Sequence, residues 1–148
     1  MLSLRRGLRE RLLGESSRSK RVSVWAEDAA SAPQEFAALL RELAQSDSME
    51  LAIWDRAPQL AQALIELDLP RAAAASEQVV RVPFASLARV LDRLSPFSFG
   101  GRLPDAGMEV VFSIYDDNIE LSAELGGVEL VHAVQAAGAR AGVLKDSD

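Results

Sequence analysis

Three carboxylates, Glu27, Asp28 and Asp55, are the residues of this 148-residue sequence best placed to do chemistry. They stand at the ends of two stretches with the pattern of a β-strand, RVSVWAE (21–27) and MELAIWD (49–55). In open parallel sheets, ligands bind beyond the carboxyl ends of the strands. If the two strands are neighbours, the three side chains converge, and their oxygen atoms suit Mg²⁺. The simpler alternative is structural, with Asp55 capping one helix and Glu27 and Asp28 stabilising the positive end of another.

Other catalytic patterns are weaker still. The sequence has no cysteine, which excludes disulfides, thiolate zinc sites and a cysteine nucleophile. His132 is the only histidine, and we expect it to face solvent on a helix. The pairs Gly100-Gly101 and Gly126-Gly127 lack the spacing and the lysine of a phosphate loop. We therefore predict no catalytic residues and no cofactor.

Four other residues are candidates for contact with a partner. Trp25 and Trp54 each lie near the end of a predicted strand, where a tryptophan either packs into the core or faces outward. Burial is the commoner outcome, but two tryptophans on an uncovered sheet face would form an anchor for another protein. Asp116 and Asp117 lie at the tip of a predicted hairpin and can contact a partner, although aspartate is also an ordinary turn residue.

Strands alternating with helices predict the fold class. Predicted strands at 21–27, 49–55 and 79–84 each precede a helix with apolar residues at i, i+3, i+4 and i+7, the stripe of a helix lying on a sheet. Ser31 is expected to cap the first of these helices. Such β-α units usually pair in parallel. We predict a single α/β domain with a mixed sheet of about five strands, three from β-α units and two from a C-terminal antiparallel hairpin, and with helices mainly on one face.

The hairpin lies within residues 107–125, where apolar and polar residues alternate on both sides of an Asp-Asp-Asn turn. Matching the apolar faces requires an even number of loop residues. Two registers meet this condition, with either 116–117 or 117–118 as the loop. The first places Glu109 opposite Glu124, so we prefer the second. The preceding segment, 95–104, is predicted as an ordered loop, and 128–143 as a closing helix.

The N-terminal segment, 1–20, has a different character from the single α/β domain predicted for 21–148. Its leucines predict a short amphipathic helix over 2–14, followed by a polar linker. Residues 1–21 hold seven basic and two acidic side chains, a net +5, so the remainder carries −11 of the total of −6. The segment can dock on the acidic body, serve as an arm that touches a partner, contact nucleic acid or a membrane surface, or be disordered.

These features predict a non-enzymatic protein-interaction module. An acidic body repels nucleic acid and suits a basic protein partner. Inhibitors, immunity proteins and adaptors are often small acidic proteins of this kind, and homo-oligomers are compatible with it. The alternative is a Mg²⁺-dependent enzyme or a ligand-binding domain that uses Glu27, Asp28 and Asp55. No membrane span or export signal is recognisable in the sequence, so we expect a soluble, cytoplasmic protein.

Overall fold

The structure is a computed structural model that describes residues 1–5, 21–52, 79–94, 99–113, 118–123 and 127–144. These residues form seven strands, three α-helices and one short 3₁₀ helix. The strands are β1 (Leu2–Arg5), β2 (Arg21–Ala26), β3 (Ser48–Ala52), β4 (Val79–Pro83), β5 (Phe99–Leu103), β6 (Met108–Ser113) and β7 (Asn118–Ala123). The helices are α2 (Ala32–Ala44), α4 (Phe84–Leu94), α5 (Gly127–Ala141) and the 3₁₀ helix η1 (Pro104–Ala106).

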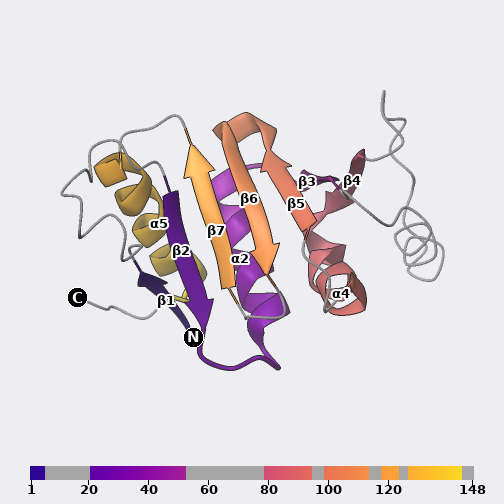
Figure 1. Cartoon of the computed structure of the whole chain (residues 1–148), viewed down its shortest axis with the longest axis horizontal. Helices are drawn as coiled ribbons and strands as arrows, with labels where there is room; N and C mark the ends of the chain where they lie inside the picture. Colours follow the sequence, from indigo (N-terminus) through magenta and orange to yellow (C-terminus); the bar gives the residue numbers. More distant parts are fainter. Residues whose placement is uncertain (6–20, 53–78, 95–98, 114–117, 124–126, 145–148) are drawn as a thin grey trace.

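The strands form one sheet in the order β1-β2-β7-β6-β5-β3-β4 (Figure 1). The predicted combination of helices and strands is confirmed. The prediction of a mixed sheet with about five strands is wrong, because seven strands are described and all their pairings are antiparallel. β2 and β3 run in the same direction, as a β-α-β unit requires, but β7, β6 and β5 lie between them. β4 and β5 likewise share a direction and lie on either side of β3.

The three described helices lie on one face of the sheet, with α2 packed between α4 and α5 (Figure 1). Side chains alternate between the two faces of a strand, and the apolar ones point toward the helices. The apolar stripes predicted for the helices after 21–27 and 79–84 are confirmed, since every described side chain in them is buried: Phe36, Leu39, Leu40 and Leu43 on α2, and Leu87, Val90 and Leu91 on α4. The predicted closing helix is α5, and it buries Leu130, Val131, Val134 and Ala137 in the same way. None of the helices in the described ranges is long and apolar enough to cross a membrane.

The N-terminal residues join the sheet. Leu2–Arg5 form strand β1, which pairs with β2, so the predicted helix is wrong at these four residues. Leu2 is fully buried, and its N–H donates to the carbonyl of Val143 across 2.7 Å. The remainder of the segment, 6–20, lies outside the described residues. The docking and partner-arm alternatives for it therefore stay predictions.

The hairpin is confirmed but its register is neither of the two predicted. β6 and β7 pair with Val111 opposite Glu120 and Ser113 opposite Asn118, which leaves 114–117 between the paired ends, outside the described residues. The prediction of an even-numbered loop is confirmed, because Val110 and Leu121 face the core together. In the observed register Glu109 lies opposite Ser122 and not opposite another acid. Like-charge repulsion therefore does not distinguish the observed register from the predicted one with 117–118 as the loop.

The segment predicted as an ordered loop contains strand β5, which pairs with β3 and β6. Glycine is depleted in strands, which is why the FGGRL sequence does not indicate one. Its position here has a packing reason. A Cβ at Gly101 would lie 2.6 Å from Met49 Cε, 3.0 Å from Phe112 Cε2 and 3.2 Å from the carbonyl oxygen of Glu50. Glycine therefore lets two core side chains close over the middle of β5.

We expect Gly101→Ala to lower the free energy of unfolding by about 1–3 kcal/mol, because the added methyl group overpacks the core. Without overpacking, alanine would stabilise a strand relative to glycine. A loss of stability in Gly101→Ala would therefore show that the added methyl group overpacks the core. Urea denaturation measures it. Gly107→Asn is the control, since Gly107 has φ of 63° and a Cβ added there would meet nothing within 4 Å, and asparagine tolerates that conformation. A stabilising Gly101→Ala would contradict the packing of β5 described above.

Candidate functional site

The sheet face opposite the described helices, here called the open face, carries most of the polar side chains of the strands. Two groups of residues lie on it. The charged row runs straight across the sheet and consists of Arg21, Ser122, Glu109, Arg102, Glu50 and Arg81. The tryptophan patch lies nearer the other ends of β2, β7 and β6 and consists of Trp25, Asn118, Ser113, Ser23, Glu120 and Val111.

The charged row alternates in sign over its larger part. Arg102 lies between Glu109 and Glu50, and Arg81 follows Glu50, with 3.9 Å between the guanidinium and the carboxylate. Opposite charges facing each other across strands stabilise that pairing and disfavour a shifted register. Exposed pairs of this kind contribute little free energy, about 0–1 kcal/mol each. The row therefore has a structural explanation within the sheet.

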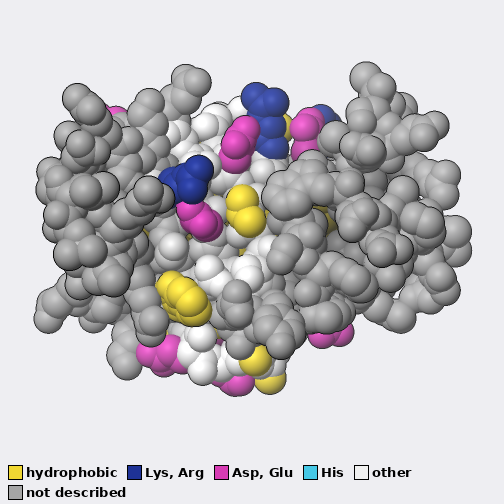
Figure 2. Space-filling view, viewed as in Figure 1, with side chains coloured by type: hydrophobic (Ala, Val, Ile, Leu, Met, Phe, Trp, Pro, Cys, Tyr) yellow, Lys and Arg dark blue, Asp and Glu magenta, His cyan; other side chains and the backbone are white. Residues whose placement is uncertain are grey.

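The tryptophan patch is different, because it contains apolar side chains on the polar face. Val111 is 39% exposed, and Trp25 is partly exposed on the neighbouring row. They lie two strands and two residues apart, which places their Cα atoms about 12 Å from each other. Figure 2 shows hydrophobic side chains emerging among polar ones in the middle and lower part of this face. Glu120, between the two, forms a 3.4 Å ion pair with Arg21.

Acidic residues lie at the edge of the sheet nearest Trp25. Glu27 and Asp28 follow directly after β2, and both are exposed. In Figure 2, acidic side chains are visible along the lower edge of the same view. Acidic residues therefore lie on two sides of Trp25, with Glu27 and Asp28 beyond the end of β2 and Glu120 on the neighbouring strand β7.

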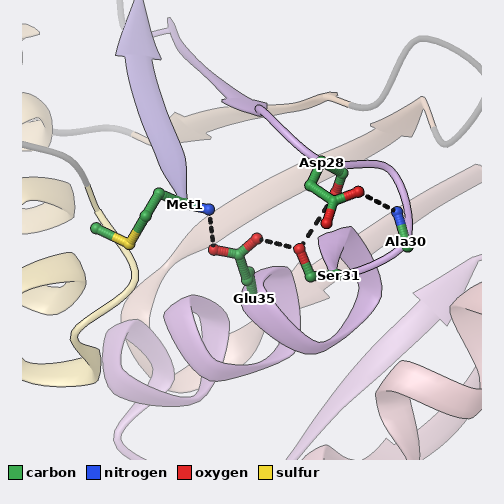
Figure 3. A network of polar contacts seen from close by, with 5 residues as sticks. All are labelled: Met1, Asp28, Ala30, Ser31 and Glu35. Carbon is green, nitrogen blue, oxygen red and sulfur yellow. Dashed lines mark hydrogen bonds and ion pairs between the residues drawn. The ribbon is translucent and has the colours of Figure 1, made fainter.

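A network of polar contacts fixes this edge to the start of α2 (Figure 3). The amino group of Met1 lies 2.7 Å from one carboxylate oxygen of Glu35, and the hydroxyl of Ser31 donates to the other across 2.9 Å. Asp28 accepts a hydrogen bond from the N–H of Ala30 across 3.1 Å, which closes the turn between β2 and α2. The carboxylate of Asp28 thus has a structural role.

The expected capping by Ser31 is wrong in its mechanism, although α2 does begin directly after Ser31. The side chain of Ser31 accepts no hydrogen bond from the helix backbone. Its hydroxyl is instead a donor to Glu35, one turn into the helix. The Ser31 hydroxyl and the Met1 amino group hold the Glu35 carboxylate from both sides, which ties β1 to α2.

The premise of the Mg²⁺ hypothesis is wrong. Glu27 and Asp28 follow β2, whereas Asp55, which lies outside the described residues, comes three positions after β3. The carboxyl ends of β2 and β3 are at the same edge, but three strands separate them, a distance of about 19 Å at 4.8 Å per strand. Within the described ranges, no group of three or more potential ligand side chains could hold a metal ion.

The partner-binding candidates are only partly described. Trp25 faces away from the helices and is not buried in the core, contrary to the commoner outcome for tryptophan. Trp54, Asp116 and Asp117 lie outside the described residues. The predicted exposure of His132 on a helix is confirmed.

Trp25 is the one residue of the tryptophan patch that sequence reasoning selected, and Val111 and Glu120 are the most important of those that it missed. One signal could have found Val111, because in the alternating pattern of 108–114 it is an apolar residue at a polar position. No sequence pattern places Glu120 on the strand beside Trp25, since that arrangement depends on the pairing of β2 with β7. Comparison with protein-family models, curated proteins and solved structures finds no match to this chain.

Proposed function

We propose that this chain is a non-enzymatic protein-interaction module that binds a basic protein. Its sharpest version is an inhibitor or immunity protein that masks a basic surface of its partner, and an adaptor is the broader version. The observation that carries the proposal is the tryptophan patch, where a partly exposed Trp25 and the exposed Val111 lie beside acidic residues. Tryptophan is enriched among residues that dominate binding energy, and apolar side chains on a polar face favour association.

The charge of the chain supports the choice of partner. The net charge is −6, and residues 22–148 carry −11. A negative field speeds the approach of a basic protein and repels nucleic acid, so the proposal includes no nucleic-acid partner. Association driven in this way weakens as salt screens the charges, over a length of about 10 Å at 0.1 M.

A pull-down with the full chain from native lysate, at low and at high salt, tests the proposal. We expect a basic protein to be retained at low salt and largely released at roughly 0.5 M salt, where screening is stronger. The retained protein is identified by mass spectrometry, and light scattering shows whether the chain itself forms oligomers. Retention of a small molecule with no protein would contradict the proposal and favour a ligand-binding domain.

A further inference from the structure

We propose that the tryptophan patch, together with Glu27 and Asp28, is the surface that receives the basic partner, and that it binds a segment in which apolar side chains are flanked by lysine or arginine. This inference rests on the proposed function and adds the location of the interface and the chemistry of its occupant. The exposure of the patch and its charge carry it.

The apolar part of the site is provided by β2 and β6. Val111 is 39% exposed near the centre of the sheet, where its neighbour across β7 is Glu120. The described helices all lie on the other face, so none of them covers Val111 or Trp25. A valine in this position gains from burial by a partner, at roughly 25 cal/mol for each Å² of apolar surface removed from water.

The charged part of the site selects a basic segment. Among the described residues, Glu27 and Asp28 follow Trp25 beyond the end of β2, and Glu120 lies opposite Val111 on β7, where it pairs with Arg21. That pair is weak, because Arg21 is 73% exposed and 3.4 Å from Glu120. The charged row, by contrast, holds three arginines and two glutamates. A cationic segment is therefore attracted to the tryptophan patch and gains nothing from the row.

Photo-crosslinking locates the interface. Two variants of the full chain are prepared, each with the photoreactive amino acid p-benzoylphenylalanine at one position. In the first it replaces Val111. In the matched control it replaces Ala136, which is exposed on α5 behind the sheet. Both proteins are irradiated in cells that naturally produce the chain. We expect an adduct with a basic protein from position 111 and none from position 136.

Substitutions then test the chemistry, with the partner retained in the pull-down as the probe. Val111→Arg is expected to weaken binding at least tenfold, and Ala136→Arg less than twofold. Glu27→Gln combined with Asp28→Asn is expected to weaken binding about tenfold at low salt and to reduce its salt dependence. Asparagine keeps an acceptor for the N–H of Ala30. Asp92→Asn with Glu129→Gln removes the same charge from exposed sites on α4 and α5, and should change affinity less than twofold.

The outcomes separate this inference from the function on which it rests. Two results would place the interface elsewhere while the chain remains an interaction protein. One is an adduct from position 136 alone. The other is an equal loss of affinity in the Glu27→Gln, Asp28→Asn variant and in the control variant with Asp92→Asn and Glu129→Gln. A pull-down that retains no protein would remove both. Urea denaturation of each variant checks that it folds, and the crosslinking result stands without the substitutions.

Discussion

Replacing Leu2 by alanine is expected to lower the free energy of unfolding by about 2–5 kcal/mol, which is the usual cost of truncating a buried leucine. Leu2 is 0% exposed and belongs to the core, although it is the second residue of the chain. Its backbone is held by pairing with Ala26 and by the 2.7 Å hydrogen bond to Val143. The backbone of β1 therefore cannot shift to fill the cavity that the smaller alanine side chain leaves.

Ser3→Ala is the matched control, because Ser3 is the next residue of the same strand and points to the other face of the sheet. We expect this change to stay within about 0.5 kcal/mol. Thermal unfolding should show the difference as a fall of roughly 4 °C or more for Leu2→Ala. Equal and small effects of the two substitutions would mean that β1 does not belong to the folded sheet in solution.

The position of β1 also shows why the pattern of the N-terminal segment is misleading. Leucines at 2, 4, 8 and 12 fit helical spacing over the whole segment, but the residues of β1, LSLR, alternate equally well as a strand. Four residues are too few to decide between the two periods. Deleting residues 1–18 would therefore not distinguish docking of a helix from a partner arm, because the deletion removes β1 in either case.

The sheet illustrates a different limit of sequence reasoning. A helix that follows a strand determines the direction in which the next strand runs, and β2 and β3 do run in the same direction. It does not determine which strands become neighbours. Here β7, β6 and β5 occupy the positions between β2 and β3, so a pattern typical of parallel pairing is found in an antiparallel sheet. The pairing of β2 with β7 brings together residues about a hundred positions apart in the sequence, and no local pattern predicts which distant strands pair.

The same limit applies to the candidate site. Alternation assigns the faces of the hairpin correctly, because the period of a strand is a local property. The grouping of Trp25, Glu120 and Val111 depends instead on the pairing of β2 with β7 and of β7 with β6. Likewise, the predicted convergence of Glu27 and Asp28 with Asp55 requires β2 and β3 to be neighbours, and this premise fails because three strands lie between them.

Phe112→Ala is expected to lower the free energy of unfolding by about 3–5 kcal/mol. Phe112 is 0% exposed in β6, and its ring approaches the position where Gly101 has no side chain, with 3.0 Å to a Cβ built there. The core is closed on this side by β5 and on the other by the helices, so the cavity left by the ring cannot readily collapse. Urea denaturation followed by circular dichroism measures the loss.

The adjacent residue provides the sharpest comparison, because Val111 and Phe112 are neighbours in one strand and point to opposite faces. Val111→Thr exchanges a methyl group for a hydroxyl of similar size, and at 39% exposure the hydroxyl remains accessible to water. We expect a change within about 0.5 kcal/mol, as for other exposed positions. A loss for Val111→Thr that approaches the loss for Phe112→Ala would mean that Val111 is buried in solution. The open face would then be unavailable to a partner, and the interface proposed at Trp25 and Val111 would be wrong.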